Sequence, residues 1–292
     1  MIRSFALFAL LVVAGLPAFA ATDGITVVDD AGRKVTLPRA PQRIVSIAPG
    51  ATEMLFAAGA GARVIATVEF SDEPAEAKKV PRIGDSNAVD MERVVALRPD
   101  VVVVWEGGSN VAQVDRLEKL NVPLYRHRVT RLGDIPMSLR RLGALADTRA
   151  AAEAAAHDVE TRLASLEKRY AQAAQKPTVL LEVWNRPIYT VGGAQMMTDS
   201  LRLCGARNVF GDLKEQGPSV DTEAVIGRDP QIIVAVAPPG LSQEWLAEWK
   251  RFTTLRAVRD GRLVPFEDSR LSRLGPSAVG GTEALCEALH RK

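Results

Sequence analysis

The chain has 292 residues, of which 47% are hydrophobic and 25% are charged, and its formal net charge is +2. So small a charge excess argues against a protein whose main task is to hold nucleic acid or an anionic membrane surface. The length and the apolar content are sufficient for two hydrophobic cores of ordinary domain size.

Residues 1–20 have the composition of a cleavable secretory signal peptide. Arg3 is followed by an apolar run from Phe5 to Leu16, and the segment ends in Ala18-Phe-Ala20. This run is too short for a membrane anchor, and no later stretch approaches the ~20 apolar residues of a spanning helix. We therefore expect the mature chain to start at Ala21 and to reside in the periplasm as a soluble protein.

The next part of the chain predicts a small hairpin and then a lobe. Residues 21–42 predict an N-terminal hairpin flap, because two alternating apolar segments flank the turn sequence Asp29–Arg33. Residues 43–147 alternate short apolar segments with helical patterns, which predicts an α/β lobe with a parallel sheet. The expected strands are 44–47, 64–67, 101–105 and 123–125, and the expected helices are 52–58, 92–97, 111–120 and 135–146.

Residues 148–176 predict a connecting helix. The stretch 148–175 contains no proline or glycine, and apolar side chains recur at helical spacing at Val159, Leu163, Leu166 and Tyr170. A helix of this length extends about 40 Å at 1.5 Å per residue. We expect it to join two lobes as a stiff rod.

Residues 177–292 predict a second α/β lobe of similar length. Its expected strands are 178–183, 188–191 and 231–236, and its expected helices include 197–203, 223–229 and 282–290. The predicted fold class is therefore α/β, with two parallel-type sheets flanked by helices, one long rigid helix between the lobes, and a ligand cleft where the lobes meet.

One sequence cassette occurs twice, and its first residues, Glu92 and Glu223, are 131 positions apart. Each copy reads as a short helix that starts at a glutamate, ends at a proline and precedes a β-branched strand. A glutamate in the first helical turn is favoured by the helix dipole, by ~0.3 to 1 kcal/mol, and is expected at the surface. Its recurrence on two lobes favours a pair of docking contacts for a symmetric partner; a purely local role at the helix start is the alternative.

Two cysteines and three histidines limit the chemistry of the chain. In an oxidising compartment Cys204 and Cys286 are expected to form one disulfide, with two buried free thiols as the alternative. His157 and His290 are expected in solvent. His127 lies just past a predicted strand end, and a surface position is expected for it, with a place in a cleft as the alternative. No phosphate loop, nucleophile elbow or zinc-protease motif occurs, so we expect no catalytic residues and no metal site.

Several residues that follow predicted strands are candidates for a ligand cleft, because ligands of open α/β sheets bind at the carboxyl ends of the strands. Trp105 stands beside two glycines, which let the backbone approach a bulky group. The other candidates, with ordinary packing as the alternative for each aromatic, are Phe70, Trp184, Tyr189, Asp268 and Arg273.

These motifs resemble the periplasmic binding proteins with a rigid helical backbone that serve ABC importers for cobalamin, haem and iron-siderophores. The resemblance covers nearly the whole mature chain, and it is greatest to the cobalamin-binding members. It is carried by the segments 43–53, 92–100, 103–108 and 204–210 and by the Cys204/Cys286 pair.

The resemblance implies a ligand between the lobes and one exposed glutamate per lobe, here Glu92 and Glu223, that pairs with arginines of a dimeric permease. It also implies that Trp105, Phe70 and Tyr189 line the cleft. Two cleft tryptophans of the family are replaced at about Ser86 and Gly217, and an acidic and basic pair is matched approximately by Asp268 and Arg273.

Cobalamin is the first expectation for the ligand, with Trp184 as a substitute wall of the cleft. Haem is the second; it requires an axial ligand, for which Tyr125, His127 and Tyr189 are the candidates. A ferric siderophore, which requires clustered arginines, is the third. An exported enzyme that uses Glu182 or Asp268 is a remote alternative. We expect a monomer without an intrinsic cofactor.

Overall fold

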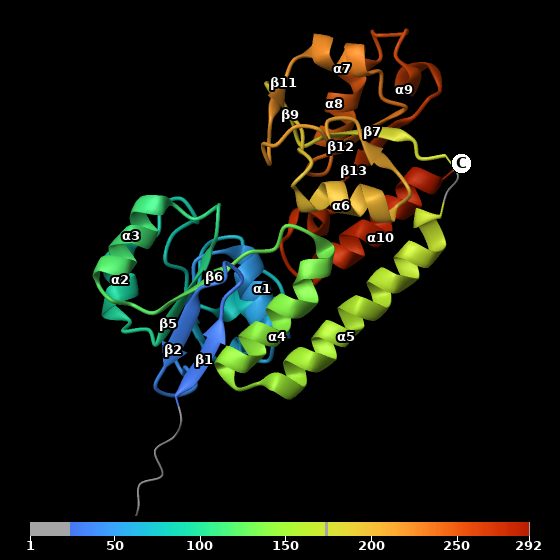
Figure 1. The fold of residues 1–292 in the computed structure, drawn as a ribbon. Coiled ribbons are helices and arrows are strands. Elements are labelled where there is room, and N and C mark those ends of the chain that lie inside the picture. Colours follow the sequence, from blue (N-terminus) through green and yellow to red (C-terminus); the bar gives the residue numbers. More distant parts are fainter. Residues whose placement is uncertain (1–23, 173–174, 292) are drawn as a thin grey trace, which may run out of the picture.

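The computed structural model describes residues 24–172 and 175–291, so the predicted signal peptide 1–20 lies outside the described residues. Two parallel sheets flanked by helices occupy opposite ends of the molecule (Figure 1). The predicted α/β class is confirmed. No helix in the described part of the chain combines the length and the apolar character that a membrane span requires.

The first sheet has the strand order β4-β3-β5-β6, and all its strand pairs are parallel. Its central strand β5 carries four valines and is buried on both faces, which is why an unbroken β-branched run is favourable there. The strands are β3 Ile44–Ser46, β4 Val64–Ala66, β5 Val101–Trp105 and β6 Leu124–His127, and the main helices are α1 Pro49–Ala57, α2 Met91–Ala96, α3 Val111–Lys119 and α4 Ile135–Ala146.

The N-terminal hairpin consists of β1 Ile25–Val28 and β2 Lys34–Leu37, which pair in antiparallel fashion. Leu37 is buried in the largest core cluster, and the Asp30 backbone N–H donates to the Arg126 carbonyl of β6. The Asp29 carboxylate also accepts from the Arg126 N–H, at 3.1 Å. The hairpin is therefore fixed to the edge of the first sheet.

The connecting helix α5 spans Arg149–Leu166, or 18 residues, and continues as a π-helical turn at Glu167–Ala171. It is shorter than the predicted 148–176, of which residues 173 and 174 lie outside the described part of the chain. Figure 1 shows α4 beside α5, and a Cβ on Gly143 of α4 would lie 2.2 Å from the Ala152 Cβ of α5. The connector is thus packed along a neighbouring helix.

The second sheet has the order β10-β7-β12-β13 and is also entirely parallel. Its elements are β7 Thr178–Glu182, α6 Met196–Leu203, β10 Arg207–Asn208, α7 Thr222–Arg228, β12 Ile232–Val236, α8 Leu241–Trp249, α9 Arg256–Arg259, β13 Leu263–Phe266, a 3-10 turn Ser269–Ser272 and α10 Ser277–His290. A small antiparallel sheet is added by β8 Trp184–Asn185, β9 Ile188–Tyr189 and β11 Ser219–Val220.

Covalent and polar contacts hold the second lobe together and join it to the first. Cys204, at the end of α6, forms a disulfide with Cys286 of α10, so the predicted bridge is confirmed. Across the boundary between the lobes, Ser277 at the start of α10 donates its N–H and its hydroxyl to the Glu53 carboxylate of α1, at 2.5 and 2.8 Å. The two lobes therefore share a hydrogen-bonded seam.

Candidate functional site

Two cavities lie side by side where the lobes meet. Cavity A has a volume of about 420 Å³ and is bounded by the start of α1 and by the 272–274 segment before α10. Cavity B, of about 450 Å³, is bounded by the ends of β5 and β6 on one lobe and by 190–197 on the other. Both are lined by Trp105, Ser272 and Leu274, so they form one interlobe cleft around Trp105.

Trp105 is the last residue of β5, and its position depends on Gly108. The Trp105 N–H donates to the Ser109 hydroxyl at 2.9 Å, which closes the turn after the strand. A Cβ on Gly108 would lie 1.9 Å from the indole ring, so only glycine permits this ring position. Trp105 is half-buried and lines both cavities.

Phe70 lines cavity A from the loop after β4. Its side chain is 74% exposed, and its φ of 65° lies in the left-handed region that a bulky residue rarely adopts. Exposure of a large aromatic side chain and an unfavourable backbone conformation at one residue are typical of a binding site. Phe70 is therefore available to a ligand at the mouth of cavity A.

Cavity B contains a polar group that the sequence analysis missed. Thr190 is fully buried and lines this cavity, and its hydroxyl has no hydrogen-bond partner among the described residues. Met196 and Met197 line the same wall and supply flexible apolar surface. A buried hydroxyl without a partner costs free energy, so Thr190 leaves an unsatisfied polar group in the wall of cavity B.

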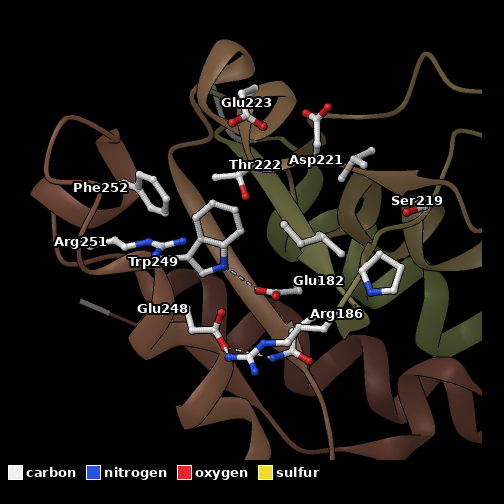
Figure 2. A pocket seen from close by; sticks show the side chains of 14 residues that line it. Glu182, Arg186, Ser219, Asp221, Thr222, Glu223, Glu248, Trp249, Arg251 and Phe252 are labelled. Carbon is white, nitrogen blue, oxygen red and sulfur yellow. Dashed lines mark hydrogen bonds and ion pairs between the residues drawn. The ribbon is translucent and has the colours of Figure 1, made fainter.

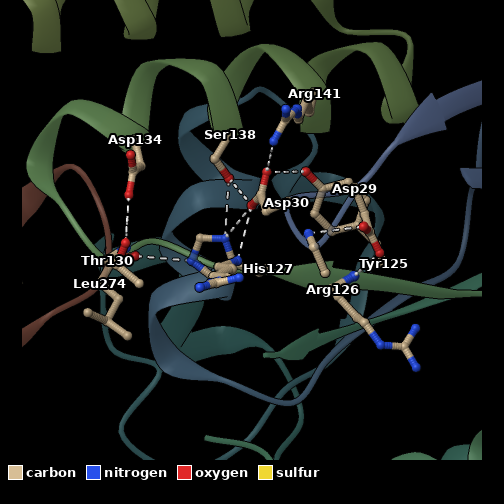
Figure 3. Close-up of polar contacts among 12 residues, drawn as sticks. Asp29, Asp30, Tyr125, Arg126, His127, Thr130, Asp134, Ser138, Arg141 and Leu274 are labelled. Atoms are coloured by element: carbon tan, nitrogen blue, oxygen red, sulfur yellow. Dashed lines mark hydrogen bonds and ion pairs between the residues drawn. The ribbon is translucent and has the colours of Figure 1, made fainter. Parts of the chain in front are cut away.

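A polar cluster around Asp30 adjoins the cleft and includes His127 and Leu274, which line cavity A (Figure 3). His127 lines cavity A but is only 1% exposed, so its predicted surface position is wrong. Its Nδ1 faces the Asp30 carboxylate at 3.2 Å, and its Nε2 faces the Leu274 carbonyl at 3.2 Å. Its neighbours come from the hairpin turn and from the other lobe, which are distant in sequence. His157 and His290 are exposed, as predicted.

Asp30 is the centre of this cluster. Although burial opposes ionisation, hydrogen bonds and the charge of His127, with donation from the Ser138 hydroxyl and the Arg128 N–H, lower the pKa of Asp30. The Tyr125 hydroxyl donates to the same carboxylate at 3.0 Å, and Arg141 pairs with it at 3.1 Å. Burial, together with the negative charge of Asp30, raises the pKa of Tyr125 well above its usual value.

The predicted ligand residues divide into two groups. Trp105, Phe70, Ser86 and Arg273 line cavity A, and Gly217 lines cavity B. Neither cavity is lined by Trp184, Tyr189 or Asp268.

These three residues have other neighbours. The Trp184 ring packs edge-on against the Trp245 ring, with the ring centroids 6.0 Å apart. Tyr189 of β9 is the strand partner of Trp184 of β8 in the small antiparallel sheet. Asp268 is bonded to Arg270, which lowers the pKa of its carboxyl group. Glu182 lies in a separate cavity of the second lobe.

The two cassettes begin in the same way. Asp90 caps α2 by accepting the Arg93 N–H at 2.9 Å, and Asp221 caps α7 by accepting the Ala224 N–H at 2.7 Å. Each helix is therefore opened by an aspartate, and the glutamate that the sequence analysis placed at the start follows two positions later. Glu92 and Glu223 are both exposed in the first turn, as predicted.

The chemistry of the cleft is mainly apolar, with few charges. Among the described residues that line it, the only tyrosine or histidine is His127, whose ring nitrogens both face protein acceptors. Tyr125 is fully buried and is bonded to Asp30. The arginines of the cleft, Arg128 and Arg273, line different cavities. The arrangement suits a large ligand with apolar faces and polar amide groups.

Comparison with known proteins agrees with this arrangement. A model of the family described as periplasmic binding protein matches residues 44–268. A vitamin B12-binding protein of Yersinia pestis (strain Pestoides F) is 32% identical over 256 residues, which cover 87% of this chain and 89% of the relative. The corresponding protein of Vibrio parahaemolyticus is 29% identical over 246 residues, which cover 84% and 88%.

Two solved structures have the same fold. The periplasmic vitamin B12-binding protein of Vibrio cholerae superposes with a TM-score of 0.77 at 27% identity, covering 86% of this chain and 97% of that chain. A periplasmic haem-binding protein from Pseudomonas aeruginosa superposes with a TM-score of 0.73 at 26% identity, covering 86% and 93%.

Proposed function

Because this chain belongs to the periplasmic binding protein family, we propose that it captures cobalamin, or a related corrinoid, in the interlobe cleft and delivers it to an ABC-type permease of the inner membrane. The observation that carries the proposal is the cleft itself, in which Trp105 joins two cavities. The cleft has aromatic and apolar walls, and the relatives with the highest sequence identity described above are named for vitamin B12 binding.

The contacts follow from the geometry of the cleft. Trp105 and Phe70 offer flat apolar surface to the ring system of a corrinoid, and Arg273 meets its peripheral amides. The Thr190 hydroxyl, which is buried in the wall of cavity B, joins these contacts when its side chain turns toward the ligand. Ser86 and Gly217, which line the cavities with small side chains, leave room for the ligand. Contributions from Trp184, Tyr189 and Asp268 remain predictions.

Haem is the second candidate, because a haem-binding protein has the same fold at 26% identity. Against haem stands His127, whose nitrogens already face the Asp30 carboxylate and a backbone carbonyl, so that axial ligation would first have to break these contacts. A ferric siderophore ranks third, since Arg128 and Arg273 line separate cavities.

The family and its relatives imply a periplasmic location and a role in transport without catalysis. We propose that residues 1–20 direct export and are removed, and that the mature protein is a monomer. Glu92 and Glu223, exposed in equivalent helical turns, would each pair with an arginine of a dimeric permease.

The test is a titration of the purified mature protein with cyanocobalamin, haemin and a ferric siderophore, followed by tryptophan fluorescence and calorimetry. We expect saturable 1:1 binding of cyanocobalamin, weakened by about tenfold or more in Trp105→Ala through loss of stacking. Saturable binding of haemin alone would overturn the cobalamin assignment and leave the fold assignment intact.

A further inference from the structure

A third cavity, of about 610 Å³, lies in the second lobe and shares no residue with cavities A and B (Figure 2). It is located at the carboxyl end of β7, between the β8–β9 hairpin, the start of α7 and the end of α8. Glu223, the docking residue of the second lobe, belongs to its lining. The cavity therefore opens beside the proposed contact with the permease.

Glu182 is a buried carboxylate in the wall of this cavity. It is 2% exposed, and Trp249 Nε1 donates to its Oε2 at 2.8 Å. In the described part of the chain, its carboxyl group has no second hydrogen-bond donor and no ion-pair partner. Burial raises the pKa of Glu182 to about 7; the bond from Trp249 opposes this rise, and the negative charge of Glu248 adds to it.

The charges around Glu182 are unbalanced. Three further carboxylates line the cavity, from Asp221, Glu223 and Glu248. The facing cations are Arg186, which pairs with Glu248 at 2.6 Å, and Arg251, whose guanidinium lies over the Phe252 ring at 4.7 Å from its centroid. Four carboxylates, of which Asp221 caps α7, and two guanidinium groups thus line the cavity, and its lining also includes the aromatic residues Trp249 and Phe252.

We propose that this cavity receives a basic side chain of the membrane permease, arginine or lysine, with Glu182 as its buried counter-charge. The inference rests on the proposed function, because it extends the docking contact of Glu223 inward. A cation in this cavity would supply the missing partner of Glu182 and contact aromatic faces. The permease is favoured over a free amine because the cavity is continuous with Glu223.

The first measurement uses agmatine, which carries a guanidinium and an ammonium group, as a soluble probe. The Trp249 indole N–H, assigned in the NMR spectrum with Trp249→Phe, reports the protonation of Glu182. We expect saturating agmatine to lower the pH midpoint of the Trp249 signal by about one unit. The affinity for agmatine should then be about tenfold weaker at pH 5.5 than at pH 8.5.

Glu182→Gln should abolish this pH effect and lower agmatine affinity about tenfold. The matched control, Glu244→Gln, changes an exposed carboxylate on α8, the helix that carries Trp249, and should behave like the parent protein. No response of the Trp249 signal to agmatine would overturn the proposal.

The second measurement is uptake of labelled cyanocobalamin by cells that lack the chromosomal copy and produce each variant. We expect Glu182→Gln to reduce uptake several-fold while cyanocobalamin affinity stays at the parent value. If agmatine binds but uptake through Glu182→Gln equals that of the parent, the cavity holds a free cation and the docking proposal is wrong. Failure of the parent protein to bind cyanocobalamin would instead contradict the proposed function.

Discussion

Trp105 occupies its place in the cleft because the residue three positions later has no side chain. The indole covers the Gly108 backbone, and the glycine therefore permits this ring position although it lines neither cavity itself. Thr190 is a second residue whose surroundings matter, because its buried hydroxyl has no hydrogen-bond partner among the described residues.

Gly108→Ala should weaken cyanocobalamin binding about tenfold or more, because the new Cβ would lie 1.9 Å from the Trp105 ring and displace it. Isothermal titration calorimetry measures the affinity. Gly133→Ala is the control, since a Cβ there would have no heavy atom within 4 Å. Equal affinities in the two variants would mean that the ring position does not matter for binding.

Thr190→Val should raise the free energy of unfolding by about 1 kcal/mol while it lowers ligand affinity about threefold to tenfold. The valine removes a buried hydroxyl that lacks a partner and keeps the shape of the side chain. Urea unfolding and ligand titration report the two quantities. A variant that is less stable and binds normally would show that the hydroxyl has a structural role.

Glu182→Gln should stabilise the ligand-free protein in a pH-dependent way. The folded-state pKa of about 7 exceeds the unfolded value, so the native carboxyl is stabilising only in its protonated form, and stability is lost as the pH rises from 4.5 through 7. The variant should therefore be more stable by about 3 kcal/mol above pH 7, with no such gain below pH 4.5. Urea unfolding across this pH range measures the difference in free energy of unfolding between the variant and the parent protein. A difference that does not change with pH would contradict the prediction.

At the scale of elements, the bounds were predicted best where the pattern lies within a single segment of the sequence. The valine run of β5 and the amphipathic pattern of α4 gave the observed bounds, 101–105 and 135–146. β13 was missed because it contains Pro265, which a strand tolerates at a sheet edge, and β13 is an edge strand. α1 begins at Pro49, earlier than predicted, because proline is accepted in the first helical turn.

The site was less predictable than the fold, because it depends on contacts between distant segments. Trp105 could be found as an aromatic residue between a strand and two glycines. The burial of His127 could not, since it depends on Asp30, 97 positions away, and on Leu274 of the other lobe. The missing partner of Thr190 is likewise a property of the folded surroundings alone.

The disulfide links α6 and α10 across a sequence separation of 82 residues. Replacing both cysteines with alanine should lower the free energy of unfolding by roughly 2 to 4 kcal/mol, because the unfolded chain regains the freedom of that loop. Urea unfolding with and without reductant measures the loss. Reductant should lower the free energy of unfolding of the parent protein to a similar extent and leave that of the double variant unchanged. If full reduction does not change the stability of the parent protein, the predicted contribution of the disulfide is wrong.

At the scale of the whole molecule, Glu92 and Glu223 place one exposed carboxylate on each lobe, both in the turn after an aspartate cap. We expect Glu92→Ala and Glu223→Ala each to reduce uptake about tenfold, because each removes one charged contact with the permease, while ligand affinity stays unchanged. Uptake by cells and calorimetry of the purified variants separate the two effects.

The controls for this experiment are Glu76→Ala and Glu287→Ala, which remove an exposed carboxylate from each lobe away from the cassettes. Both should transport like the parent protein. Normal transport by the Glu92→Ala/Glu223→Ala double variant would remove the docking role from both residues.

The seam between the lobes also limits how such proteins can be recombined. Glu53 of the first lobe binds the first residue of α10 in the second, and a Cβ on Gly275 would lie 2.8 Å from the Glu53 carboxyl group. A hybrid that joins one lobe of this chain to the complementary lobe of a relative must inherit the carboxylate, the serine and the glycine together. Ligand preference is therefore easier to graft through the loops around Trp105 and Thr190 than by exchange of entire lobes.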